Sequence, residues 1–194
     1  MALDHASEFI TCDSIKSYGV INKTVTLSPP HGSNFKEITW KKQKDKVIDW
    51  YDSKIKTFEP FKNRAYLDIV SGNLTISNLT SSDEDEYEFV SSDGNTTAMF
   101  SLTVLDPLPS PTLNCSSNDE NIIVECMLPD FSRHVDLLVY SWTCSSEKCK
   151  REAKLKIIFE KEDDLSQEVW CIVKNPVSAM NSSIILRTCM PAGK

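Results

Sequence analysis

Two cysteines and one tryptophan in the second half of the chain constrain the fold more than any other feature. Trp142 lies 16 residues after Cys126 and 29 residues before Cys171. This spacing is typical of a disulfide that joins two facing β-sheets, with the indole packed on the sulfur atoms. The sequence therefore predicts a β-sandwich in this half, with a covalent link between its two layers.

Cysteine usage is concentrated in the same half. Six of the seven cysteines lie between residues 115 and 189, and the seventh is Cys12. A crowded even set indicates disulfides and an oxidising compartment. Six cysteines allow many pairings. We expect one bridge across the sheets, and elimination and strand order favour two more: Cys126–Cys171, Cys115–Cys189 and Cys144–Cys149.

Metal sites are the competing interpretation of two clusters. Cys144, Cys149 and His134 suggest zinc, but the gap between the cysteines is too wide for a knuckle and no second pair has ligand spacing. The acidic run Asp83–Glu86 suggests calcium, but it lacks the Asp- and Gly-containing loop that wraps the ion. We expect no metal and no cofactor.

Glycosylation acceptors indicate an extracellular protein independently of the cysteines. The pattern Asn-x-Ser/Thr, the acceptor for N-linked glycans, occurs six times. The six asparagines are Asn22, Asn73, Asn78, Asn95, Asn114 and Asn181.

The domain organisation follows from length and from one proline-rich stretch. The chain has 194 residues, and immunoglobulin-type domains contain about 100. Three prolines between Leu105 and Pro111 indicate a short, stiff link. We expect an expression or signal-peptide remnant at 1–12, a domain at 13–105, a hinge at 106–112 and a second domain at 113–190. The predicted fold is all-β, with two tandem immunoglobulin-like sandwiches: a variable-type one without a disulfide, then a constant-type (C2) one with disulfides.

The first half carries its own version of this link between two sheets, with an aromatic residue in place of a cysteine. Trp40 is the expected core indole, and Phe89 takes the place of the second cysteine. Asp83 and Tyr87 match the tyrosine corner of such sandwiches. Arg64 is a candidate to pair with Asp83, and an unrelated surface pair is an equally good interpretation. Four runs alternate apolar and polar residues, which is typical of half-buried strands: 38–41, 74–77, 87–89 and 100–104.

Composition and motifs exclude several function classes. The net charge of −7 gives no electrostatic basis for binding nucleic acid or an anionic membrane surface. No apolar run is long enough to span a bilayer, so this stretch is expected to be soluble. Three scattered histidines and the absence of catalytic motifs argue against an enzyme and against a small-molecule substrate.

A lysine-rich segment is the best candidate for a binding surface. Four lysines and one aspartate follow Trp40 within residues 41–46. Alternation points Glu37, Lys41 and Gln43 away from the core, and we expect Lys44, Asp45 and Lys46 in the loop that follows. Mixed charges on a flat sheet suit recognition by complementary ion pairs. The competing interpretation is an ordinary solubilising surface.

Four stretches resemble one known family: Lys36–Val47, Phe61–Asp68, Leu79–Glu88 and Leu108–Leu113. They are similar to the signalling lymphocytic activation molecule-related group of the immunoglobulin superfamily. The likeness runs from about Tyr18 to Cys189 and includes the pattern of six cysteines.

That resemblance implies a cell-surface adhesion glycoprotein, membrane-anchored in its full-length form, that supports T-cell adhesion and costimulation. Its implied partner is the T-cell erythrocyte-rosette receptor, bound by the GFCC′C″ sheet of the first domain. A related receptor with a different or homophilic partner, or a soluble decoy, are the alternatives. Trp50 and Tyr51 depart from the family pattern, where a leucine and a glutamate are expected. The implied contact residues are Glu37, Lys41, Lys42, Lys44, Asp45, Lys46, Asp49 and Phe58.

Overall fold

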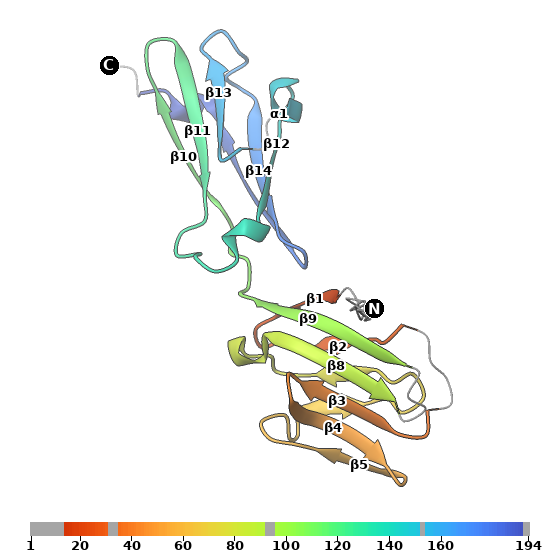
Figure 1. The fold of residues 1–194 in the computed structure, drawn as a ribbon. Coiled ribbons are helices and arrows are strands. Elements are labelled where there is room, and N and C mark those ends of the chain that lie inside the picture. Colours follow the sequence, from red (N-terminus) through yellow and green to blue (C-terminus); the bar gives the residue numbers. More distant parts are fainter. Residues whose placement is uncertain (1–13, 31–34, 92–95, 152–153, 192–194) are drawn as a thin grey trace, which may run out of the picture. The chain divides into compact units, whose positions relative to one another are not determined.

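The computed structural model describes residues 14–30, 35–91, 96–151 and 154–191. The chain divides into two compact units, residues 1–105 and 106–194, and strands dominate both (Figure 1). The predicted remnant at 1–12 with Cys12, and the acceptor Asn95, lie outside the described residues.

The first unit consists of two β-sheets. The larger one has the strand order β1-β9-β8-β3-β4-β5 (Figure 1). The smaller one has the order β2-β7-β6. Strand β1 is parallel to β9, and the other neighbours are antiparallel. The strands are β1 (Ile15–Val20), β2 (Val25–Leu27), β3 (Ile38–Lys42), β4 (Asp45–Tyr51), β5 (Lys54–Thr57), β6 (Ala65–Leu67), β7 (Leu74–Ile76), β8 (Asp85–Ser91) and β9 (Thr97–Leu105).

Apolar packing takes the place of a disulfide between these sheets, because Trp40 and Phe89 of the larger sheet share one buried cluster with Leu27 and Leu74 of the smaller one. Trp40 is fully buried, and its ring lies 5.3 Å from that of Phe89 and 5.2 Å from that of Phe100. Its indole N–H donates to the carbonyl oxygen of Gly72 at 2.9 Å, so the one polar atom of the side chain is satisfied. The alternation predicted for β3, β7, β8 and β9 is confirmed, because the apolar member of each pair is buried.

The tyrosine corner is present at one end of this unit. The Tyr87 hydroxyl donates to the backbone oxygen of Asp83 at 2.7 Å. The Arg64 guanidinium donates to both carboxylate oxygens of Asp83, at 2.6 and 2.8 Å, which settles the sequence ambiguity about this arginine. Thr80, at the start of the 3-10 helix η1 (Ser81–Asp83), also donates its backbone N–H to that carboxylate.

The second unit has two three-stranded antiparallel sheets, β10-β11-β13 and β12-β14-β15. Leu108, within the predicted hinge, packs in the core of this unit, so only part of the proline-rich stretch is a connector. Its elements are β10 (Thr112–Ser117), β11 (Asn121–Met127), η2 (Val135–Leu137), β12 (Val139–Thr143), α1 (Lys148–Arg151), β13 (Lys156–Glu160), β14 (Glu168–Lys174), β15 (Ala179–Ile185) and η3 (Leu186–Cys189).

Three disulfides hold the second unit together, and they are the three pairs chosen from the sequence: Cys126–Cys171, Cys115–Cys189 and Cys144–Cys149. The first links β11 to β14 and therefore joins the two sheets. Trp142 stands directly opposite Cys171 on the neighbouring strand, so its indole lies beside the bridge. The third bridge uses the two thiols that suggested zinc, so neither is available as a metal ligand.

The Arg64–Asp83 pair makes the stability of the first unit sensitive to acid. The Asp83 carboxylate is 1% exposed and the Arg64 side chain 17%. Burial raises the pKa of Asp83, but the Arg64 and Thr80 hydrogen bonds and the Arg64 charge outweigh it, and the pKa lies below its ordinary value. Because the native pKa is depressed, this stabilisation is present above the unfolded pKa and is lost as pH falls through the native one.

We expect Asp83→Asn to lower the free energy of unfolding by about 3 kcal/mol at neutral pH, because it leaves a mostly buried guanidinium without its carboxylate. Denaturant unfolding over a range of pH measures this. The parent protein should lose stability below about pH 4, and the variant should lose less there. If both proteins lost the same free energy of unfolding below about pH 4, the Arg64–Asp83 pair would not be the source of the acid sensitivity.

Candidate protein-binding face

The side chains that point away from the core of the six-stranded sheet form one continuous surface, which we call the outer face. The register puts Lys41 of β3 opposite both Lys46 of β4 and Glu88 of β8. On the next strand pair of the sheet, Asp49 of β4 lies opposite Lys56 of β5. Residues opposite one another on neighbouring strands have their Cβ atoms about 5 Å apart, so these charges share one patch. The outer face comprises Thr39, Lys41, Lys46, Asp49, Tyr51, Lys54, Lys56, Phe58, Glu86 and Glu88.

A bulge in β4 creates this patch. The pairing shifts between Trp40 and Lys41, so that Trp40 lies opposite Ile48 while Lys41 lies opposite Lys46. Val47 is the extra residue, and both Val47 and Ile48 are buried. A regular strand would expose one of two adjacent residues. The bulge keeps both apolar side chains inside and returns Lys46 to the outer face.

The hairpin between β3 and β4 is shorter than the sequence prediction. We expected Lys44, Asp45 and Lys46 in the loop, but the turn consists of Gln43 and Lys44, and β4 begins at Asp45. Gln43 adopts a left-handed backbone with φ of 53°. Its side-chain amide donates to the Asp85 carboxylate at 2.8 and 2.9 Å, which fastens the tight turn to β8.

Ion pairs connect the charges of the outer face in the free protein. Lys41 Nζ lies 3.0 Å from Glu88 Oε2, and Lys46 Nζ lies 2.8 Å from Asp49 Oδ2. The Lys41 and Glu88 side chains are 33% and 32% exposed, and those of Lys46 and Asp49 are 49% and 15% exposed. Exposed pairs of this kind contribute little to stability. The lysines can therefore exchange their present partners for carboxylates of another protein at small cost to the fold.

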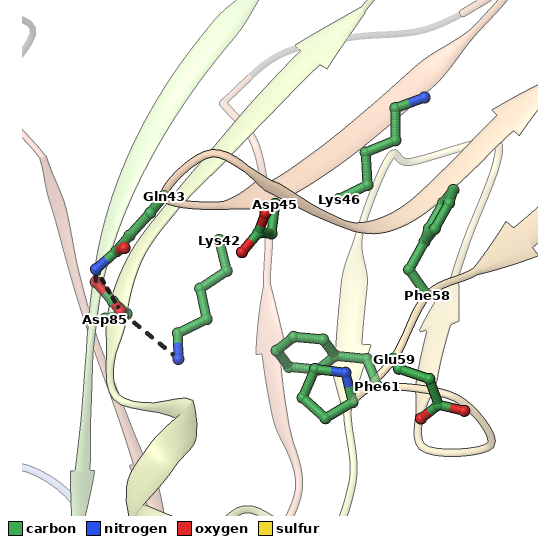
Figure 2. Close-up of a pocket in the computed structure, with 9 residues that line it drawn as sticks. Lys42, Gln43, Asp45, Lys46, Phe58, Glu59, Phe61 and Asp85 are labelled. Carbon is green, nitrogen blue, oxygen red and sulfur yellow. Dashed lines mark hydrogen bonds and ion pairs between the residues drawn. The ribbon is translucent and has the colours of Figure 1, made fainter.

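Phe58 provides an apolar element next to the lysines. It follows β5 directly, and its backbone N–H donates to the carbonyl oxygen of Val47 at 3.0 Å. The ammonium groups of Lys56 and Lys46 lie 4.9 and 5.7 Å from the centre of its ring, within range of a cation–π attraction. Lys46 and Phe58 extend to the same side of the hairpin in Figure 2.

Lys42 and Asp45 lie at the end of the hairpin, apart from the outer face. The register pairs Lys42 with Asp45 and with Tyr87. Lys42 and Asp45 are thus one position away from Lys41 and Lys46. Lys42 Nζ donates to the carbonyl oxygen of Ser82 and lies 3.6 Å from Asp85 (Figure 2). A hollow at this end is lined by Lys42, Gln43, Asp45, Lys46, Phe58, Glu59, Pro60, Phe61 and Asp85.

The predicted contact residues therefore fall into two groups. Lys41, Lys46, Asp49 and Phe58 lie together on the outer face. Glu37 belongs to this first group, because it lines a second hollow together with Thr39, Lys46 and Asp49. Lys42, Lys44 and Asp45 form the second group, at the hairpin end.

Two lysines of the outer face, Lys54 and Lys56, were not among the contact residues predicted from the sequence. Lys54 lies opposite Tyr51, and Lys56 lies opposite Asp49. Alternation from Asp49 onward was the available signal, but it required the position of the β4–β5 turn. That turn contains Asp52 and Ser53, both in the left-handed region.

Tyr51 and Trp50, the two departures from the family pattern, have different roles. Tyr51 is 64% exposed on the outer face. Trp50 is half-buried and packs against the core. The first of these substitutions therefore changes the outer face, whereas the second belongs mainly to packing.

Comparisons with known proteins point to one family. Residues 113–190 match the model of the lymphocyte function-associated antigen 3 C-terminal domain. The chain is 48% identical over 193 residues to human lymphocyte function-associated antigen 3, covering 99% of this chain and 77% of the relative. The chain belongs to the lymphocyte function-associated antigen 3 family. Human CD48 antigen is 29% identical over 177 residues, covering 85% of this chain and 71% of the relative, which confirms the wider grouping suggested by the sequence.

Solved structures agree with this family assignment. A crystal structure described as the CD2-binding domain of CD58 (lymphocyte function-associated antigen 3) has a TM-score of 0.72 at 32% identity, covering 94% of this chain and all of that one. Murine CEACAM1b has a TM-score of 0.63 at 18% identity, covering 89% of this chain and 98% of that one, which supports the immunoglobulin-like fold alone. The prediction that the chain is not an enzyme is confirmed, because members of this family are adhesion proteins.

Three residues of the acidic run, Asp83, Glu84 and Asp85, have structural roles in this member of the family. Asp83 accepts hydrogen bonds from Arg64, and Glu84 accepts one from the backbone N–H of Val104 at 2.9 Å. Burial raises the pKa of Asp85, but hydrogen bonds from Gln43 and the Glu86 backbone, with Lys42, bring it below its ordinary value. Within the described residues, no group of three or more His, Cys, Asp or Glu side chains is arranged to hold a metal ion. Nor does the described part of the chain contain a helix that could span a membrane.

The outer face should tolerate loss of its lysine charges without loss of the fold. We expect Lys41→Gln and Lys46→Gln each to change the free energy of unfolding by less than about 1 kcal/mol, because exposed ion pairs contribute little. Trp40→Ala, directly beside Lys41, should cost about 4 kcal/mol. Urea denaturation compares the three variants, and a lysine variant as damaging as the tryptophan one would show that these pairs hold the sheet together.

Proposed function

We propose that this chain is the ectodomain of a cell-surface adhesion glycoprotein that binds CD2, the T-cell erythrocyte-rosette receptor, and so supports T-cell adhesion and costimulation. The observation that carries the proposal is the outer face: exposed, exchangeable lysine and carboxylate charges next to Phe58, in a chain 48% identical to human lymphocyte function-associated antigen 3. The description of the solved relative as a CD2-binding domain supports this choice of partner.

The first unit is proposed to be a variable-type domain spanning residues 13–105. In that scheme β9, β8, β3, β4 and β5 correspond to strands G, F, C, C′ and C″. The two strands beyond β3 are the ones that distinguish a variable-type sheet, and they carry Lys46, Asp49 and Lys56. The outer face is therefore the GFCC′C″ face, and its partner is an immunoglobulin-type receptor that offers a similar flat sheet.

Recognition would work by exchange of ion pairs. Lys41 and Lys46 leave Glu88 and Asp49 for carboxylates of the receptor, while the freed carboxylates accept receptor cations. Such complementary charges raise the association rate and the selectivity more than the affinity. Weak, fast contacts become adhesive when many copies act across one cell contact. Glu37, Lys42, Lys44 and Asp45 extend the contact toward its edges.

Glycosylation would leave this face open. Among the acceptor sites within the described residues of the first unit, Asn22 lies in the turn after β1, and Asn73 and Asn78 flank β7 of the other sheet. None of the three belongs to β3, β4, β5 or β8. Because glycans are bulky, positions outside these four strands suit a first unit that binds with its outer face.

The second unit is proposed to be a constant-type (C2) spacer domain at 113–190, preceded by a hinge at 106–112. Its three disulfides stiffen it. In the full-length, membrane-anchored protein it would hold the first unit away from the cell surface and would add nothing to recognition.

Charge reversal at Lys46 tests the proposed face. We expect Lys46→Glu to weaken binding to the CD2 ectodomain about 30-fold or more, because a receptor carboxylate would then meet a like charge. Asp45→Lys should act in the same direction, and the melting temperature should change in neither variant. Lys23→Glu, an exposed lysine in the turn before β2, is the matched control and should bind like the parent. Surface plasmon resonance measures all three, and undiminished binding by Lys46→Glu would refute the face.

If the second unit is only a spacer, the first unit should bind the receptor without it. A fragment ending at Leu105 retains the whole core of the first unit. We expect it to bind the receptor with the affinity of the whole chain, within about twofold, because no contact residue lies beyond the first unit. Calorimetry of the two proteins side by side is the measurement, and a tenfold loss on truncation would assign the second unit a part in recognition.

A further inference from the structure

The second unit exposes an apolar strip on the outside of its sheet β12-β14-β15. Trp170 of β14 is 38% exposed, and Ile185 of β15 is 47% exposed. Ile172 points to the same side of β14 as Trp170, because the intervening Cys171 is buried in the core. An indole and two isoleucines along one exposed face are costly to leave in water.

A glycosylation acceptor lies within this strip. Asn181 and Ser183 of the sequence Asn181-Ser182-Ser183 are exposed on β15, whereas Met180 and Ile184 pack against the core. Strand β15 is antiparallel to β14 and pairs with it. The register places Asn181 directly opposite Ile172 and Ser183 directly opposite Trp170.

We propose that an N-linked glycan on Asn181 packs its first sugar ring against Trp170 and Ile172. Side chains directly opposite in an antiparallel pair have Cβ atoms about 5 Å apart, and diagonal ones are about 7 Å apart. Ile172 is the direct neighbour of Asn181 and Trp170 the diagonal one, so a ring on the asparagine amide reaches both. The C–H groups on one face of N-acetylglucosamine complement the electron-rich face of an indole.

The surroundings of Trp170 leave room for this sugar. Thr143 of β12 lies opposite Trp170 on its other side, and Ser141 lies opposite Ile172. Together with Ser183 they are small. The Ser183 hydroxyl donates to Glu168 Oε1 at 2.6 Å, and Trp170 remains 38% exposed, so part of the indole is open to a sugar. A protein partner docking on this strip would collide with a glycan at Asn181, whereas the glycan itself is already tethered there and loses little freedom on packing.

The acceptor on the other sheet of this unit has a different setting. Asn114 of β10 lies opposite Glu125, which pairs with Lys156 at 3.1 Å. A sugar there would meet a hydrated ion pair and no aromatic ring. The proposed contact is thus specific to Asn181, and it rests on the proposed function only in requiring that the chain is glycosylated.

A double-mutant cycle tests the contact on the whole chain, secreted from mammalian cells and trimmed to one N-acetylglucosamine per site. In the parent, Asn181→Gln should lower the melting temperature of the second unit by about 4 °C. In a Trp170→Thr background the same change should lower it by less than about 1 °C. Equal shifts in the two backgrounds would overturn the proposal.

Ile158→Thr is the matched control, because Ile158 is 56% exposed on the other sheet of the unit. It should leave the effect of Asn181→Gln unchanged. A second readout does not depend on stability: the acetyl methyl protons of the Asn181 sugar should shift upfield in the field of the indole, and lose that shift in Trp170→Thr. An unshifted methyl signal, or an empty Asn181 by mass spectrometry, would also overturn the contact. Receptor binding by the first unit would be unaffected in either case, so the two proposals fail separately.

Discussion

The burial of Trp40 is the constraint on which the first unit depends. Its indole is fully buried between the sheets, against Phe89 and Phe100, and its N–H is fixed by the carbonyl of Gly72. Because side chains alternate along a strand, this burial forces Lys41 outward and onto Glu88. The core packing that replaces a disulfide is thus also what sets the position of the exposed charges.

The two units use their exposed sheet surfaces differently. The outer face of the first unit carries lysines that are paired with carboxylates at 2.8 to 3.0 Å yet remain 33% and 49% exposed, which suits exchange with a second charged surface. The strip around Trp170 in the second unit is apolar and contains an acceptor asparagine. We have proposed transient protein contact for the first surface and packing of a covalently attached sugar for the second.

Sequence reasoning worked where a single local rule decides the outcome. Cysteine and tryptophan spacing led to the Cys126–Cys171 bridge, and elimination and strand order led to the other two disulfides. The alternation around Trp40 and Tyr87 gave the buried strands. It failed at the β3–β4 hairpin, because Val47 and Ile48 are both buried through a bulge that no alternation rule predicts. The same bulge decides that Lys46 lies on the outer face while Asp45 lies at the hairpin end.

The amino-acid sequence by itself determined the all-β fold, the cysteine framework and the family, since each of these follows from residue types at fixed spacing. Only the tertiary structure decided which charges share a surface. It brought Lys54 and Lys56 beside Asp49 and Tyr51, and through the bulge it placed Lys46 opposite Lys41. The physical reason is that strand register depends on turns and bulges selected by core packing across the whole sheet, and this information is not contained in any local stretch of sequence.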